Sequence, residues 1–369
     1  MTSSSRKIAY VLGAGFSYGS HHFAPVGQHK VNMPLQFSLF EELCRYHHKR
    51  ITSLDQVAKA IRKYFSPNTY RATRKKGSSR HQDLFGLSVE EIVTLFDEIV
   101  TNKKEGFKEI HSAAEELQGL TVELINHLST NGKPGQNKLL KSFASRLMQT
   151  DVVLTFNWDT LLERVLSNQN KYHWHTSWGY GKTVRHTFST SERNIPSIPK
   201  KYPRLLKLHG SINWVAYKTN NTTKCSITPS WGPGNKIENV VMMPPKMIKP
   251  EVWGRQTFSE LSSVSVGNNE IPRTFYPNLW EEAETHLAGC RRIVFIGYSF
   301  PPADFAVGNM LRRAISNMKV STGQFPEIDI VDPNAADLAK RFEKSFKITV
   351  PVENQYLSLQ SYLSSSRAK

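Results

Sequence analysis

A single stretch near the N-terminus decides the fold, and it reads Ile8-Ala9-Tyr10-Val11-Leu12-Gly13-Ala14-Gly15-Phe16-Ser17. The apolar run predicts a buried strand, and the closely spaced Gly13 and Gly15 predict a tight turn at its end. Glycine allows positive φ and lets backbone N–H groups approach an anion, and a helix beginning just afterwards would turn its positive end toward that anion. The stretch therefore predicts either a phosphate-binding loop, with a dinucleotide as the natural ligand, or a turn that only packs a strand against a helix.

The spacing of the glycines departs from the usual dinucleotide-binding fingerprint. The third glycine, Gly19, stands one position late, and no acidic residue falls where a ribose-binding carboxylate should close the next strand. Ordinary dehydrogenases are therefore disfavoured. The segment Gly13 to Ser17 instead resembles the opening loop of the sirtuin superfamily, and positions far downstream test that resemblance.

The composition is that of a globular protein. At 369 residues the chain can hold one large domain or two ordinary ones. The N-terminus, Met1 to Lys7, is polar, and the apolar run after it is too short and too broken by glycine for a signal peptide or a membrane span. We therefore expect a cytoplasmic protein. The three cysteines form no Cys-x-x-Cys pair, which predicts free thiols and gives neither a disulfide framework nor a cysteine zinc site: Cys44, Cys225 and Cys290.

The net charge is strongly positive, at +17 from 48 Lys plus Arg against 31 Asp plus Glu. The densest basic run is Arg71 to Arg80, and smaller runs lie at Arg45 to Arg50 and Lys200 to Lys207. Such runs fit a nucleic-acid partner, although solvated loops and ordinary helix faces are the more common reason for them. An acidic partner subunit or a polyanionic substrate is a further explanation.

The chain between residues 35 and 150 has the pattern of helices. Apolar residues recur at helical spacing, and Ser88 followed by Glu90 and Glu91 predicts a capped helix start. We interpret residues 35–150 as an all-helical insert that covers the site as a lid or wall. Its expected helices are 35–49, 54–64, 89–100, 107–128 and 138–148.

Strand patterns resume after the insert and predict a doubly wound, Rossmann-like parallel sheet. Short, nearly continuous apolar runs suit strands that are covered on both faces. Residues 1–34 and 151–369 then form one domain, interrupted by the insert. After the first strand, the expected strands are 151–155, 204–208, 239–243, 291–296, 327–331 and 346–350, and the expected covering helices are 160–166, 279–288, 303–318 and 335–344.

Polar residues follow four of these strands directly. In an open α/β sheet, ligands bind at the carboxyl edge of the strands, so residues at strand exits are the first candidates for a site. The candidates that follow the strands are Asn157 and Asp159, then His209, then Gly297 and Ser299, then Asp332.

Four motifs in the same order make the resemblance specific. The chain has Gly-Ala-Gly-x-Ser, then Thr-x-Asn-x-Asp, then His-Gly, then Gly-x-Ser, as sirtuin-like proteins do. The chain looks most similar to the bacterial sirtuin-like NAD hydrolases of antiviral defence (abortive infection). The resemblance implies that Asn157 and His209 are catalytic and that Asp159 holds the nicotinamide ribose. It further implies a phosphate and adenosine site at Gly13, Ala14, Gly15, Ser17, Gly297 and Ser299, to which we add Asp332 from its place at the same edge.

These residue types suit cleavage of the bond between nicotinamide and ribose. The reaction passes through an oxocarbenium-like state, and nicotinamide leaves as a neutral molecule, so no acid is needed to protonate it. His209, with an ordinary pKa of about 6.5, could take a proton from water or from a ribose hydroxyl, and Asn157 could orient the attacking water and the ribose. Asp159 would favour the developing positive charge.

Each candidate also has an ordinary structural interpretation. Asn157 and Asp159 could cap the following helix, and His209 could be a turn residue before glycine. A serine hydrolase is disfavoured because the segment around Ser299 lacks a nucleophile elbow and His209 precedes it. The histidine clusters have no third ligand at useful spacing, so no metal site is expected: His21-His22, His47-His48, and His173 with His175.

The segment after His209 lacks the paired cysteines of a deacylase zinc ribbon, since Cys225 is alone between Ser211 and Trp253. Water is then the remaining nucleophile, and the products are ADP-ribose and nicotinamide. The alternatives are a sirtuin-type deacylase, a non-catalytic module that binds NAD or ADP-ribose, and a nucleic-acid-binding subunit. The resemblance also implies a homo-oligomer, or a companion such as a HerA-like ATPase or an Argonaute.

Overall fold

A six-stranded parallel sheet lies at the centre of our computed structural model. The structure describes residues 7–47, 54–65, 81–131, 137–168, 174–190, 195–219, 222–228, 240–243, 271–272, 274–301 and 304–368. The basic run 71–80, His48 and His173 lie outside these residues.

The sheet has the strand order β12-β11-β10-β1-β4-β6, and every neighbouring pair is parallel. Every residue of β4 and β10 is buried, as expected for strands covered on both faces, and all but Thr155 and Arg292 are apolar. The predicted α/β class with a doubly wound parallel sheet is confirmed. The strands are β1 (Ile8–Leu12), β4 (Val152–Thr155), β6 (Arg204–Lys207), β10 (Arg292–Ile296), β11 (Glu327–Val331) and β12 (Gln355–Tyr356).

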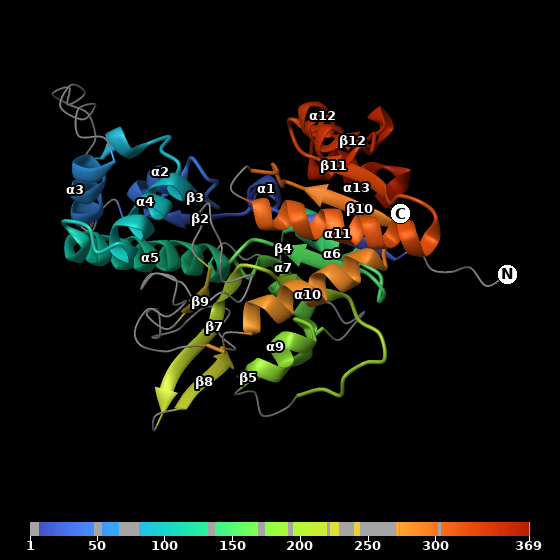
Figure 1. Cartoon of the computed structure of the whole chain (residues 1–369), viewed down its shortest axis with the longest axis horizontal. Helices are drawn as coiled ribbons and strands as arrows, with labels where there is room; N and C mark the ends of the chain where they lie inside the picture. The colour runs from blue at the N-terminus through green and yellow to red at the C-terminus, as the bar shows by residue number, and fades with distance from the viewer. Residues whose placement is uncertain are drawn as a thin grey trace.

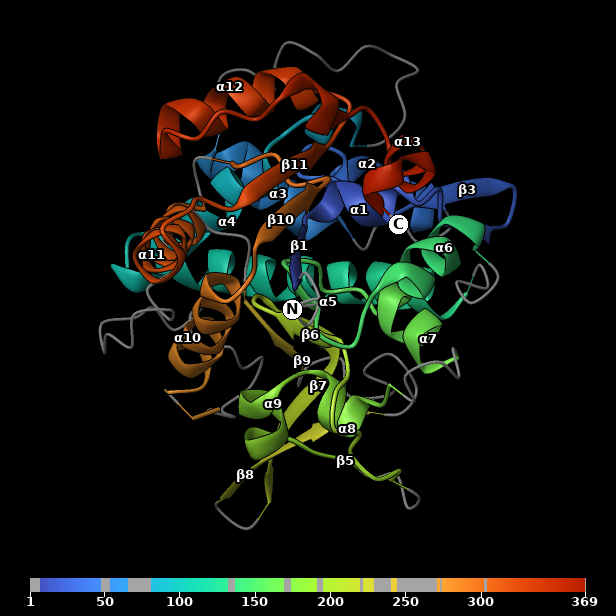
Figure 2. The same ribbon diagram turned by 90° about the vertical axis from the view of Figure 1, so that its right-hand side faces the viewer.

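Helices cover both faces of this sheet, as Figure 2 shows. On one face Tyr10 of β1 packs edge-on against Phe143, with ring centroids 5.2 Å apart. On the other face Phe295 of β10 packs against Phe342 at 5.5 Å. The first face carries α1 (Ala14–Gly19), α6 (Lys138–Arg146), α7 (Leu161–Ser167) and α13 (Leu359–Ser364), and the second carries α10 (Phe275–Ala288), α11 (Phe305–Thr322) and α12 (Ala335–Phe346).

A group of helices lies to one side of the sheet (Figure 1). The predicted cap is present, because the Ser88 side chain accepts a hydrogen bond from Glu91 N at 3.3 Å. An antiparallel hairpin that the sequence analysis did not anticipate, β2 (Phe23–Val26) with β3 (His29–Asn32), joins this group. The domain boundaries 1–34, 35–150 and 151–369 stay a prediction. The helices are α2 (Leu39–Tyr46), α3 (Asp55–Tyr64), α4 (Val89–Thr101) and α5 (Phe107–Thr130).

Two of the strands predicted for the parallel sheet, 239–243 and 346–350, are not part of it. Residues 240–242 form β9, which pairs with β7 in a separate four-stranded sheet instead of the parallel sheet. Residues 346–350 are not a strand, because α12 runs to Phe346 and Lys347 takes a left-handed backbone with φ 58°. The parallel sheet ends on β12 instead. The separate sheet has the order β5 (Ser189–Thr190), β8 (Thr222–Ile227), β7 (Gly210–Thr219), β9 (Val240–Met242), beside the short helices α8 (Thr176–Gly179) and α9 (Lys182–Thr187).

Most buried apolar side chains belong to one continuous core that runs from the helical group through the sheet. A smaller cluster joins α5 to β7 and β9, and Trp158 packs on it. None of the helices in the described part of the chain has the length and apolar character needed to span a membrane.

Candidate functional site

The glycines at the exits of β1 and β10 pack backbone against backbone. Gly13 N–H donates to Ile296 O at 3.1 Å, and Gly15 N–H donates to Gly297 O at 3.0 Å. Gly297 has φ +58°, and a Cβ there would lie 2.2 Å from the carbonyl carbon of Gly15. These N–H groups therefore bind the protein itself, and close packing is what the structure requires of the three glycines. Their role in cofactor binding stays a prediction.

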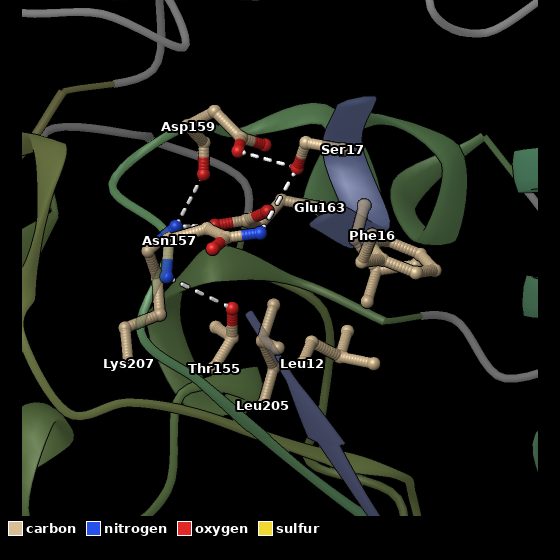
Figure 3. Close-up of a pocket in the computed structure, with 10 residues that line it drawn as sticks. Leu12, Phe16, Ser17, Thr155, Asn157, Asp159, Glu163, Leu205 and Lys207 are labelled. Atoms are coloured by element: carbon tan, nitrogen blue, oxygen red, sulfur yellow. Dashed lines mark hydrogen bonds and ion pairs between the residues drawn. The ribbon is translucent and has the colours of Figure 1, made fainter. Parts of the chain in front are cut away.

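Asn157 joins the exits of β1 and β4 through its side-chain amide. Its Nδ2 donates to Gly13 O at 2.9 Å. The same Nδ2 donates to Ser17 Oγ at 3.0 Å, and Ser17 Oγ donates to Asp159 Oδ2 at 2.7 Å (Figure 3). Both amide hydrogens of Asn157 are thus used within the protein. Its carbonyl oxygen is then the atom that can accept a hydrogen bond from a ligand. The structure brings together Gly13, Ser17, Asn157 and Asp159, as the positions at the sheet edge predict.

Asp159 both faces this network and starts α7. Its Oδ1 accepts a hydrogen bond from Leu161 N at 3.0 Å, so the ordinary interpretation as a helix-starting residue also holds. The side chain is 8% exposed. One carboxylate oxygen therefore belongs to the helix and the other to the site.

A small pocket lies beside this network (Figure 3). Alternate residues of the β4 exit line it, while Phe156 and Trp158, between them, belong to the hydrophobic clusters. The pocket has room for about one water molecule, so a ligand group can enter it only when the lining side chains move. The lining residues are Leu12, Phe16, Ser17, Thr155, Asn157, Asp159, Leu162, Glu163, Leu205 and Lys207.

Two charged residues that line the pocket, Glu163 and Lys207, were not among the site residues predicted from the sequence. Lys207 Nζ lies 2.8 Å from Glu163 Oε1, with side chains only 1% and 2% exposed, and it also donates to the Asp159 carbonyl. Burial raises the pKa of the Glu163 carboxyl, and the nearby Lys207 opposes that shift. A signal was present, because Lys207 interrupts the apolar run Leu205 to Leu208 and Glu163 interrupts the apolar start of α7.

His209 follows β6 and lies in an aromatic cluster. His209 is 6% exposed, and its ring centroid lies 5.0 Å from that of Phe156 and 6.3 Å from that of Trp280. Phe156 is the residue before Asn157, and its ring also lies 4.9 Å from Tyr298. His209 is not among the residues that line the pocket with Asn157. The structure therefore links the two predicted catalytic residues through Phe156, and among the described residues His209 does not line the pocket that Asn157 lines.

The remaining candidates lie at the same edge but outside the pocket. Ser299 is exposed in the loop after β10. Asp332 Oδ1 accepts a hydrogen bond from Asn334 N at 2.9 Å, which forms a turn at the start of α12. Ala14 is exposed at the start of α1. Their contribution to cofactor binding stays a prediction.

The histidine clusters serve local structure where the chain is described. The His22 ring lies 2.8 Å from Leu128 O, and the His175 ring accepts a hydrogen bond from Ser177 N at 3.2 Å. Within the described ranges, no three His, Cys, Asp or Glu side chains gather in a way that could hold a metal ion.

Comparison with known proteins identifies the family of this chain. A family model described as a SIR2-like domain matches residues 151–350. No curated protein matches the sequence. A crystal structure of a Sir2 homolog–NAD complex is 14% identical and covers 89% of this chain and 79% of its own, with a TM-score of 0.37. A structure described under the mechanism and regulation of Sir2 enzymes is 15% identical, covers 97% and 89%, and also has a TM-score of 0.37. Because the family model matches more than half of the length of this chain, the chain belongs to the SIR2-like domain family.

Proposed function

We propose that this protein is an NAD glycohydrolase that cleaves the nicotinamide–ribose bond of NAD and releases nicotinamide and ADP-ribose. The observation that carries the proposal is the hydrogen-bonded network of Asn157, Ser17 and Asp159 beside a small pocket, in a chain of the SIR2-like domain family. Neutral hydrogen-bonding groups and a carboxylate at a strand edge suit a sugar with developing positive charge.

The charges around the pocket favour this reaction. Two carboxylates, Asp159 and Glu163, face one ammonium, Lys207, so a cationic nicotinamide riboside is attracted and an oxocarbenium-like state is stabilised. The Asn157 carbonyl oxygen accepts a hydrogen bond from the attacking water. The new bond joins the water oxygen to the anomeric carbon, and the electron pair of the broken bond stays on the nicotinamide nitrogen.

His209 is the proposed acceptor of the proton that the water loses. Its ring packs against Phe156 and Trp280, so this step requires the aromatic cluster to rearrange when NAD binds. Conformational steps of this kind commonly limit turnover. An activating partner or signal would act on the same rearrangement.

The first test is the release of nicotinamide and ADP-ribose from NAD by the purified full chain, followed by chromatography. Asn157→Ala is expected to lower kcat by about 10²–10⁴-fold, because the water loses its orienting acceptor. Asn102→Ala, at the exposed end of α4, is the matched control and should keep the wild-type rate. Equal rates for Asn157→Ala and wild type would contradict the proposal.

A second candidate is a non-catalytic module that binds NAD or ADP-ribose. The burial of His209 among aromatic rings, outside the pocket, favours it. Such a module would bind NAD in calorimetry and return it intact after prolonged incubation. A deacylase is less favoured, because the described segment after His209 forms β7 and β8 and holds one cysteine, Cys225.

The resemblance to defence proteins adds a cellular role to the proposal. The enzyme would deplete cytoplasmic NAD on viral infection, as a homo-oligomer or with a companion such as a HerA-like ATPase or an Argonaute, and nucleic acid would be a partner of the basic run 71–80. Cellular NAD measured after infection, with and without the Asn157→Ala variant, tests this role. An NAD level that falls equally in both would contradict it.

A further inference from the structure

A buried ion pair forms part of the pocket wall. Lys207 and Glu163 are 2.8 Å apart, and neither side chain has more than 2% of its surface exposed. Burying two charges is unfavourable unless each finds a close partner, and a well-packed apolar pair is often at least as stable. The core has apolar side chains on either side of Lys207, at Leu206 and Leu208. Stability alone therefore does not explain a charged pair at this position.

Lys207 binds the backbone of the residue that supplies the site carboxylate. Its ammonium donates to the Asp159 carbonyl and to Glu163 Oε1, as Figure 3 shows. Asp159 in turn accepts the Ser17 hydroxyl on one oxygen and Leu161 N on the other. Removing the ammonium would leave a buried carbonyl without its donor, at the residue whose carboxylate faces the pocket.

Further hydrogen bonds join the β4 exit to the turn that carries His209. Trp158 O accepts Ile212 N at 3.1 Å and the Ser211 hydroxyl at 3.4 Å, just beyond His209. Lys207 makes its contacts just before that residue. Buried polar side chains also connect Glu163 to β7, because the Tyr180 hydroxyl lies 3.3 Å from Glu163 Oε1 and accepts a hydrogen bond from Asn213 Nδ2 at 3.0 Å. Hydrogen bonds thus join the loop after β4 to the chain on both sides of His209: Lys207 binds it from before His209, and Ser211 and Ile212 bind it from after.

We propose that Lys207 is a positioning residue, held by Glu163, that fixes the Asp159 loop in the geometry required for NAD cleavage. This inference rests on the proposed NAD hydrolysis. Lys207 is not expected to touch the reacting atoms, because both of its hydrogen-bond partners belong to the protein.

The charge of the pair gives a readout that a purely structural role would not have. The groups facing Glu163 and Lys207 are Asp159, Tyr180 and each other. In Glu163→Gln the Lys207 ammonium loses its carboxylate partner, and a buried lysine without a carboxylate loses its proton more easily. A neutral amine is a weaker donor to the Asp159 carbonyl than an ammonium is. The rate of Glu163→Gln should therefore fall as the pH rises, along a new limb that the wild type lacks.

The experiment compares Lys207→Met with a matched buried pair at the opposite edge of the sheet. Lys207→Met should lower kcat by about 10²-fold with KM changed by less than about threefold, because misplaced groups affect chemistry more than binding. Arg292 pairs with Asp329 at the start of β10, with side chains 6% and 0% exposed. Arg292→Met should lower the melting temperature but keep the wild-type kcat per folded molecule.

The outcomes separate the two proposals. Wild-type turnover with an unchanged kcat in Lys207→Met, or an equal loss in Arg292→Met, overturns the positioning role and leaves NAD hydrolysis standing. If Lys207→Met does not fold, the pH profile of Glu163→Gln decides, and the absence of a new limb overturns the role. If the wild type releases no nicotinamide under any condition, the proposed function fails and the positioning role fails with it.

Discussion

Gly297 shows how strictly single positions are constrained at the strand exits. Its φ is +58°, and a Cβ would lie 2.2 Å from both the Gly15 carbonyl carbon and Phe16 N. Gly297→Ala should therefore lower the free energy of unfolding by about 2–5 kcal/mol, the sum of about 1–2 for the left-handed backbone and about 1–3 for overpacking. Urea unfolding followed by circular dichroism measures the change.

Gly323 is the matched control for this prediction. It also has a positive φ, of +72°, but nothing lies within 4 Å of an added Cβ. Gly323→Ala should cost only the backbone term of about 1–2 kcal/mol. Equal losses in the two variants would show that the contact between the β1 and β10 exits is not tight.

The sequence predicted part of the site because strand exits share one edge of a parallel sheet. Ser17, Asn157 and Asp159 meet there as expected, although they are far apart in the chain. Lys207 and Glu163 were missed because charged residues in apolar runs are usually taken as exposed, and their pairing depends on how α7 packs on β6. Spacing along the chain does not report such packing.

At the scale of elements, Arg164 of α7 connects the helical group to the sheet. Its guanidinium donates to the carbonyls of Ser129 and Thr130 at the end of α5, with 3.0 Å to the latter. A cation at a helix C-terminus satisfies carbonyls that lack partners within the helix. Arg164→Met should lower stability by about 1–3 kcal/mol and speed hydrogen exchange at the end of α5, measured by mass spectrometry.

The exposed pair of Lys340 and Asp337 on α12 provides the comparison, with side chains 80% and 78% exposed. Lys340→Met should change stability by less than about 1 kcal/mol, because exposed pairs contribute little. Faster exchange over the whole chain in Arg164→Met, without a local effect at α5, would contradict a specific connection.

Element types followed from the sequence more closely than strand partners did. Residues 89–101 and 107–130 have clear helical periodicity and form α4 and α5. The run at 240–242 is a strand, as predicted, but pairs with β7, because a short β-branched run does not encode its neighbour. The edge strand β12 has two residues and is too short to leave a pattern.

At the scale of the whole molecule, a net charge of +17 makes acid an unfavourable condition for this fold. Protonating further groups increases the repulsion within an already cationic protein. Three histidines add to this acid sensitivity, because burial, complete at His22 and partial at His127 and His286, lowers their pKa. The unfolded chain takes up protons on these residues before the folded chain does.

His286 of α10 offers the sharpest test of that acid sensitivity. Burial, together with the charges of Arg204 and Lys7, lowers its pKa from 6.5 to about 4. Its contribution to stability is therefore present above pH 6.5 and is lost as the pH falls toward 4. Between pH 7 and pH 5 the wild type should lose about 2 kcal/mol more unfolding free energy than His286→Gln. Urea unfolding at both pH values measures this difference. The exposed His186→Gln should follow the wild type, and parallel losses in His286→Gln and wild type would show that the His286 ring is charged in the folded protein at pH 5.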